Sequence, residues 1–196
     1  SQNGESMNRQ CLEPCVAAYL NKFYCIFDEM MRGMSGTGIN CSISHNFIVQ
    51  MIPHHKAAIE MAQNLLRYTS NPSLQEIASG IVTEQTKSIA EMEKILDFCC
   101  GYENSQDELC IYLSKINAVM NRMFHKMSHV CATNQINCNF MREMIPHHEG
   151  AVEMSKTTLQ FAICPQLVPI LDSIISSQER GIIQMQNLMK CLGCEV

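Results

Sequence analysis

Apolar residues recur at intervals of three and four along most of the chain, which is the spacing of amphipathic α-helices. The pattern predicts helices over about residues 16–34, 45–69 and 73–98, and again over about 107–129, 138–162 and 166–191. Pro72 and Pro165 fall near the first turn of the third helix of each set, where a missing N–H costs least. No alternating, β-branched run flanked by turns is present, so the sequence predicts an all-α protein.

The six predicted helices form two sets of three in one common register. The letters MIPHH occur at residues 51–55 and again at 144–148, a shift of 93 residues. The same shift superposes Phe47 on Phe140, Met92 on Met185, and many residues between them. We therefore interpret the chain as a single domain, 1–196, built from two tandem three-helix repeats, about 16–100 and about 107–194.

The second helix of each repeat carries two adjacent histidines on its apolar side. On a helical wheel His54, His55 and their counterparts His147 and His148 lie in an inward arc of roughly 120°. Glu60 lies on the opposite side. The same arc also holds the following residues: Phe47, Met51, Ala58 and Met61, and in repeat 2 Phe140, Met144, Ala151 and Met154. An unpartnered buried imidazole costs about 1–3 kcal/mol of stability. Because both repeats carry such a pair at the same spacing, the histidines are expected to have a function beyond packing.

Imidazole and thioether together favour soft metal ions, which points to Cu(I) and, by the same softness, Ag(I). Thioethers carry no proton and cannot form disulfides, so they bind metal where cysteines are oxidised. The candidate ligands of the two repeats are Met30, Met34, Met51, His54, His55, Met61, Met92, Met123, Met127, Met144, His147, His148, Met154 and Met185. The alternative is that these methionines fill a core and the histidines are satisfied by hydrogen bonds.

A second histidine pair lies on the first helix of repeat 2. His125 and His129 are one turn apart, on the face opposite Met123 and Met127, and have no counterpart in repeat 1. They are further metal candidates, or part of a solvated helix face. A di-iron enzyme would need several inward carboxylates and Glu-x-x-His, and neither Glu-x-x-His nor His-Glu-x-x-His occurs. The sequence therefore indicates a binding protein rather than an enzyme.

Composition narrows the class of partner. Hydrophobic residues make up 46% and charged residues 17%, which is typical of a globular protein. The net charge is -5 without a basic cluster, which argues against nucleic acid, and no apolar stretch is long enough to span a bilayer. The expected partners are metal ions and a protein that donates or accepts copper.

The chain contains 12 cysteines, an even number that favours paired disulfides in an oxidising compartment. A reduced thiolate cluster that holds a soft metal is the alternative. The pseudo-symmetry is expected to bring Cys99 and Cys100 to the same end of the bundle as Cys191 and Cys194. Adjacent Cys99 and Cys100 are too close to bond each other, so they are expected to bond two different segments. Flanking cysteines within reach are Cys11, Cys15 and Cys110.

The stretches FIVQMIPHHKAAIEMA (47–62) and FMREMIPHHEGAVEMS (140–155) resemble the DUF305 family, whose members carry a paired Met-x-Pro-His-His-x-x-Ala-x-x-Met motif. The resemblance includes the downstream pairs Gln85/Met92 and Gln178/Met185. It implies a ferritin-like fold and extracytoplasmic copper binding linked to copper resistance. The motif methionines and histidines, with Met92 and Met185, are the implied ligands. The chain differs at Ser88 and Gly181, where an acidic residue is often found, and in its high cysteine content.

These observations predict a ferritin-like, antiparallel four-helix bundle that is stabilised by disulfides and covered by two short first helices. The expected function is that of a secreted or periplasmic protein that binds Cu(I), with Ag(I) and Cu(II) as further ligands, for storage, buffering or detoxification. Two alternatives remain. One is a secreted, disulfide-rich interaction protein with Met and His in its core, and the other is a copper-dependent redox enzyme.

Overall fold

The computed structural model describes residues 12–194. Its elements in chain order are α2 (Pro14–Ser35), α3 (Ile43–Leu66), α4 (Pro72–Cys99), α5 (Gln106–Ser128), α6 (Ile136–Thr158), the 3-10 helix η1 (Pro165–Leu167) and α7 (Val168–Leu192). Within this range no residue forms a strand, which confirms the all-α prediction. The predicted bounds agree to within a few residues, except that the second helices end earlier, at Leu66 and Thr158.

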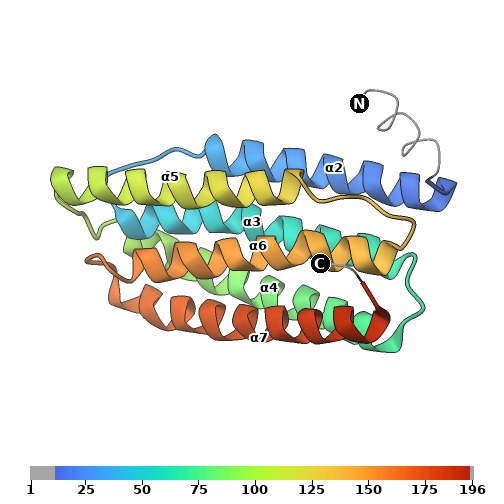
Figure 1. The fold of residues 1–196 in the computed structure, drawn as a ribbon. Helices are drawn as coiled ribbons and strands as arrows, with labels where there is room; N and C mark the ends of the chain where they lie inside the picture. The colour runs from blue at the N-terminus through green and yellow to red at the C-terminus, as the bar shows by residue number, and fades with distance from the viewer. Residues whose placement is uncertain (1–11, 195–196) are drawn as a thin grey trace, which may run out of the picture.

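The helices α3 and α6 lie side by side in the middle of the molecule (Figure 1). Helices α2 and α4 pack on α3, and α5 and α7 pack on α6. Helices α4 and α7 also contact each other, which completes the predicted bundle of α3, α4, α6 and α7. The covering helices α2 and α5 have 22 and 23 residues, against 24 in α3, so the prediction of short first helices was wrong.

Local sequence signals fix where the helices start and how closely they approach. The side chains of Ser42 and Asn71 cap α3 and α4 by accepting hydrogen bonds from backbone N–H groups of the first turn. A Cβ at Gly33 would lie only 2.9 Å from Cβ of Pro53, so the glycine lets α2 cross closely over the proline inside α3. This crossing lies one residue before the first histidine pair.

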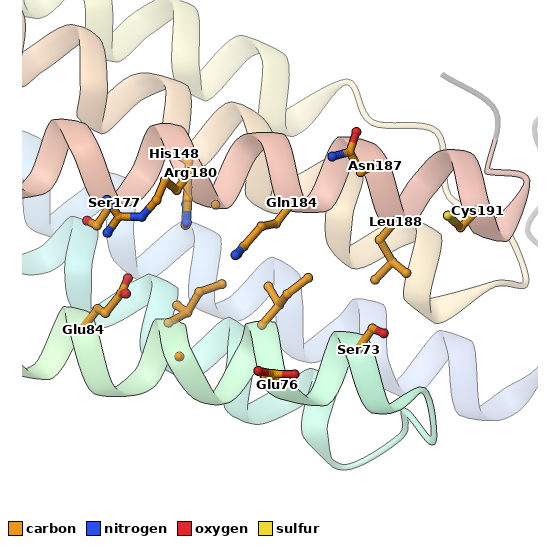
Figure 2. Close-up of a pocket in the computed structure, with 14 residues that line it drawn as sticks. Ser73, Glu76, Glu84, His148, Ser177, Arg180, Gln184, Asn187, Leu188 and Cys191 are labelled. Atoms are coloured by element: carbon orange, nitrogen blue, oxygen red, sulfur yellow. The ribbon is translucent and has the colours of Figure 1, made fainter.

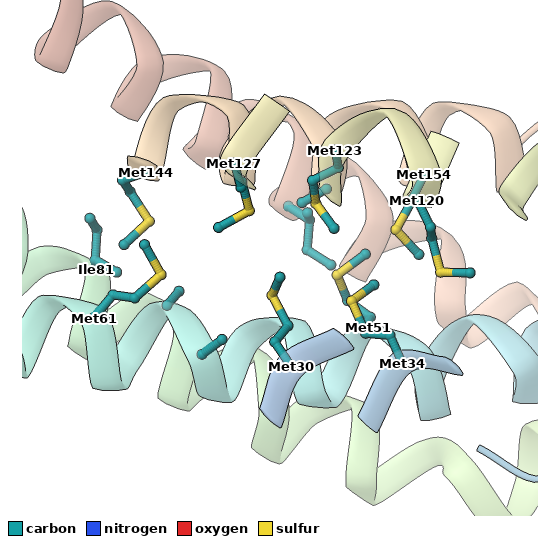
Figure 3. Packing of buried hydrophobic residues seen from close by; sticks show 14 of the residues in the cluster. Met30, Met34, Met51, Met61, Ile81, Met120, Met123, Met127, Met144 and Met154 are labelled. Carbon is teal, nitrogen blue, oxygen red and sulfur yellow. The ribbon is translucent and has the colours of Figure 1, made fainter. Parts of the chain in front are cut away.

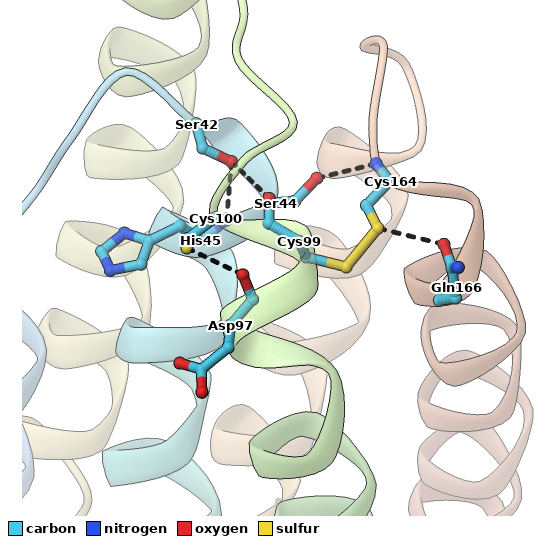
Figure 4. The surroundings of a disulfide bond; sticks show 8 residues. All are labelled: Ser42, Ser44, His45, Asp97, Cys99, Cys100, Cys164 and Gln166. Carbon is cyan, nitrogen blue, oxygen red and sulfur yellow. Dashed lines mark hydrogen bonds between the residues drawn. A yellow bond between two sulfur atoms is a disulfide. The ribbon is translucent and has the colours of Figure 1, made fainter.

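Two disulfides tie the bundle at its two ends. Cys99, at the end of α4, bonds Cys164 in the turn after α6, next to Ser42 and Ser44 (Figure 4). The Ser44 hydroxyl accepts a hydrogen bond from the Cys164 N–H at 2.8 Å. Cys138, near the start of α6, bonds Cys194 just after α7. The first disulfide thus joins the two halves, and the second links the start of α6 to the segment after α7 within the second half.

The expectation that the C-terminal ends of α4 and α7 meet was wrong. These two helices run in opposite directions, so their ends lie at opposite ends of the bundle (Figure 1). Complete pairing of the cysteines was also wrong, because seven described cysteines are free and exposed: Cys15, Cys25, Cys41, Cys100, Cys110, Cys131 and Cys191. Cys11 lies outside the described residues. The disulfide-stabilised fold itself is confirmed, and each bridge adds about 2–4 kcal/mol by restricting the unfolded chain.

No helix within residues 12–194 combines the length and the apolar character needed to cross a bilayer.

Candidate metal centre

The inner histidine pair lies where the two central helices cross. The rings of His54 on α3 and His147 on α6 stack with centroids 3.6 Å apart and planes inclined by 21°. Each Nε2–H donates to the backbone carbonyl of the other histidine at 2.9 Å. Because a carbonyl oxygen only accepts, both rings carry their proton on Nε2 and keep an unprotonated Nδ1. Neither Nδ1 has a hydrogen-bond partner among the described residues.

The outer histidines lie next to this pair, on the side of α4 and α7. The ring centroid of His55 is 6.0 Å from that of His54, and the centroid of His148 is 5.9 Å from that of His147. Both outer rings are buried, and their Nδ1 atoms also lack a partner within residues 12–194. Four buried nitrogen atoms without partners therefore gather around the centre of the bundle.

Burial keeps these imidazoles neutral. It lowers the pKa of His54 to about 4 and that of His148 to about 3. The pKa values of His55 and His147 are also lowered, first by burial and then by neighbouring imidazoles. Each of the four rings therefore keeps one nitrogen lone pair free of a proton at neutral pH, which a metal can bind.

Thioethers from several helices are buried in the same interior as the histidines. Figure 3 shows methionine side chains from α5 and α6 facing those from α2 and α3 across the interior. Every methionine predicted as a ligand is buried: Met30, Met34, Met51, Met61, Met92, Met123, Met127, Met144, Met154 and Met185. Three more buried thioethers were not singled out from sequence, Met120, Met141 and Met189. A Cβ at Gly150 would collide with Sδ of Met123, so α6 leaves space for this sulfur.

The donors fit a soft metal ion. No group of three or more His, Cys, Asp or Glu side chains that could hold a metal is found in the described part of the chain. The donor atoms that the fold buries in this interior are neutral imidazole nitrogens without partners and thioether sulfurs. Cu(I) and Ag(I) prefer this donor set, whereas Mg²⁺ and Ca²⁺ require oxygen. Each unpartnered nitrogen costs about 1–3 kcal/mol, which a bound metal would offset.

A buried carboxyl group that the sequence pattern did not single out lies one turn before His147 on α6. Glu143 on α6 is only 1% exposed, and it accepts a hydrogen bond of 2.7 Å from the Tyr19 hydroxyl. Burial raises the pKa of Glu143 to about 8. Its counterpart in the first half is Gln50, whose Oε1 has no partner among the described residues. The signal was present, because Glu143 precedes His147 by four residues and therefore shares its helix face.

The remaining predicted candidates lie away from the interior. His125 and His129 are exposed at the end of α5, with ring centroids 4.0 Å apart. Nδ1–H of His129 donates to the backbone oxygen of His125 at 2.8 Å, which closes the helix end. Glu60 is partly exposed, as the wheel predicted, and so is its counterpart Glu153, which pairs with Arg122 at 2.9 Å. The structure therefore separates the pair on α5 from the four central histidines.

The sequence pattern of the DUF305 family, described as a domain of unknown function, matches residues 29–96 and 44–189. These matches extend over most of the chain, and the protein belongs to the DUF305 family.

Solved structures share the fold. The silver-bound form of CopM is 27% identical, with a TM-score of 0.57 over 75% of this chain and 94% of that chain. CopM in its Cu(II)-bound form is 25% identical, with a TM-score of 0.57 over 76% of this chain and 97% of that chain. A DUF305 fragment from Deinococcus radiodurans shares the fold at 22% identity, with a TM-score of 0.54, over 76% of this chain and 95% of that chain.

A viral protein, the uncharacterized protein L153 of Acanthamoeba polyphaga mimivirus, is 40% identical over 47 residues. The match covers 24% of this chain and 31% of the viral protein.

Proposed function

We propose that this protein binds Cu(I), and with it Ag(I) and Cu(II), for copper storage, buffering or detoxification. One observation carries the proposal: four buried, neutral imidazoles each leave Nδ1 without a partner, in an interior full of thioethers. The similarity to CopM, solved in silver-bound and Cu(II)-bound forms, supports the same choice of metal. The metal is cargo in this proposal, and the protein binds it without catalysing a reaction.

The proposal places the protein outside the cytoplasm, as a secreted or periplasmic protein. Two disulfides favour an oxidising compartment. In such a compartment the buried thioethers keep their affinity for soft metals, whereas the seven free and exposed thiols are open to oxidation. A copper donor or acceptor protein is the expected partner.

A Cu(I) titration against a competing chelator, under anaerobic conditions, tests the proposal. We expect at least one equivalent of tightly held copper per chain, and the same stoichiometry with the redox-inert ion Ag(I). Less than one equivalent would favour an interaction protein whose methionines and histidines only pack. Bound copper that reproducibly oxidises a substrate would favour a redox enzyme instead.

A further inference from the structure

Two cavities open between α4 and α7 and reach the outer histidines. The larger has a volume of about 580 Å³ and includes His148 in its wall (Figure 2). The smaller has a volume of about 200 Å³ and includes His55. Glu84, Ser177 and Arg180 line both cavities, so the two form neighbouring parts of one groove. The groove therefore leads from the surface to the two outer imidazoles, which are themselves buried.

The two halves differ at the position that faces each imidazole. In the first half, the Ser88 hydroxyl lies 2.9 Å from Nε2 of His55 and occupies this nitrogen with a hydrogen bond. In the second half, the equivalent residue is Gly181, which has no side chain to offer. A Cβ there would lie 3.1 Å from Cδ2 and 3.3 Å from Nε2 of His148. Glycine thus leaves room in front of His148 that any other residue would fill.

The charged residues that line the two cavities also differ, and this difference again favours a cation near His148 rather than near His55. The larger cavity has two carboxylates, Glu76 and Glu84, against the single guanidinium of Arg180. The smaller cavity has Glu84 and Glu91 balanced by Lys87 and Arg180. A groove with an excess of negative charge raises the local concentration of cations. The opening over His148 therefore suits a cation in size, charge and free nitrogen, whereas the opening over His55 does not.

We propose that the metal enters through the groove between α4 and α7, that His148 is the first interior ligand it meets, and that Ser88 closes the equivalent route at His55. This inference rests on the proposed function and adds the path by which the metal reaches the interior. A metal on His148 has the inner pair as its next neighbour, since the ring of His147 is 5.9 Å away. The two halves then share the binding donors but not the access to them.

Loading kinetics test this route. Wild-type protein, Gly181→Ser and Gly80→Ser are mixed by stopped flow with Cu(I) held by a chromogenic chelator, and final stoichiometry is measured with Ag(I). Gly80 lines the same cavity, and a Cβ there meets nothing within 4 Å, so Gly80→Ser is the matched control. We expect Gly181→Ser to load about tenfold more slowly, with unchanged final stoichiometry, because the ion must wait for the side chain to move. Gly80→Ser should load like the wild type.

The outcomes separate the route from the function. Equal loading rates for Gly181→Ser and the wild type would overturn the route, and so would a lower stoichiometry at an unchanged rate. A wild-type protein that binds no metal would overturn the proposed function itself. Ser88→Gly provides a second test that only removes atoms and cannot crowd the core. It should load about twofold faster by opening the second route, and an unchanged rate would contradict the role given to Ser88.

Discussion

Helices α3 and α6 carry identical residues at one pair of equivalent positions and different residues at another pair one turn earlier. At His54 and His147 the halves are identical, and each ring donates to the backbone of the other at 2.9 Å. One turn earlier the halves differ. Glu143 is bonded to Tyr19 from α2, whereas Gln50 leaves its Oε1 without a partner in the described chain. The equivalent tyrosine of α5, Tyr112, is bonded to Thr158 instead.

The difference between these positions has a physical reason. Where the two halves meet at the centre, the two histidine rings stack and each donates to the backbone of the other, so losing one ring removes one of the two hydrogen bonds and the stacking contact. Glu143 lies toward the covering helix α2, which supplies its partner Tyr19, so this position can differ between the halves. The identical positions carry neutral bases, and the differing position adds one buried acid whose pKa is shifted in the opposite direction.

Removing the shared inner pair should have the largest effect on metal binding. The double variant His54→Ala/His147→Ala loses both stacked rings and should retain less than about half of the copper capacity, since imidazole nitrogen is the strongest neutral donor in the interior. The matched control is Glu60→Ala/Glu153→Ala, on the outward sides of the same helices, and it should retain nearly all capacity. Chelator competition measures both variants. Comparable losses would mean that the inner pair has no special role in binding.

Acid should destabilise the metal-free protein through its four buried imidazoles. The folded-state pKa of His54 is about 4, below the ordinary value of 6.5, so between these pH values the unfolded chain binds a proton that the folded protein does not. The contribution of His54 to the free energy of unfolding is therefore fully present above about pH 6.5. It falls by roughly 3 kcal/mol as the pH drops to 4. Urea unfolding from pH 7 to 4 measures this loss. A flat profile over that range would show that the rings are not buried in the neutral form.

Glu143 should give the opposite limb of the pH profile. Its folded-state pKa of about 8 lies above the ordinary 4.5, so its contribution is complete below about pH 4.5 and is lost as the pH rises through 8. Glu143→Gln should remove this limb and be more stable than the wild type at pH 8, by roughly 4 kcal/mol at most. Glutamine can still accept the hydrogen bond from Tyr19. Urea unfolding of both proteins at pH 5 and pH 8 tests this prediction. The same change in unfolding free energy for both proteins would contradict a buried carboxyl group at this position.

The fold was largely predictable because the apolar period fixes the helices and the 93-residue shift fixes their equivalence. The same period correctly placed all four histidines in the interior, with Glu60 and Glu153 facing outward. It could not show that α3 and α6 cross at the histidines, because sequence spacing does not tell where the pseudo-twofold axis passes. The pairing of Cys99 with Cys164 was missed for a related reason. An axis that reverses helix direction sends the ends of α4 and α7 to opposite ends of the bundle.

The asymmetry between Ser88 and Gly181 was visible in the sequence, but its meaning was not. Both residues were noted only as departures from an acidic residue. Their effect depends on which imidazole each one faces, and only the packing of α4 on α3 and of α7 on α6 gives that information. The same holds for Gly150, whose role depends on a thioether from another helix.

The smallest expected effect concerns the space that α6 leaves for Met123. In an open helix position, Gly→Ala stabilises by about 0.5–1 kcal/mol, because alanine has the better helix propensity. At Gly150 the added methyl group would lie 2.8 Å from Cγ of Met123, so the side chain must move and overpacking costs about 1–3 kcal/mol. Gly150→Ala should therefore be less stable than the wild type by about 1 kcal/mol.

Gly80→Ala is the matched control for this substitution, since a Cβ at Gly80 on α4 meets nothing within 4 Å. It should gain about 0.5–1 kcal/mol in the same urea titration. If Met123 also binds copper, displacing its sulfur should weaken Cu(I) affinity in Gly150→Ala but not in Gly80→Ala. In the first half, the residue equivalent to Gly150 is the buried Ala57. Equal stability gains in the two variants would therefore show that the Met123 side chain moves aside at no cost, and that Gly150 is not needed to position its sulfur.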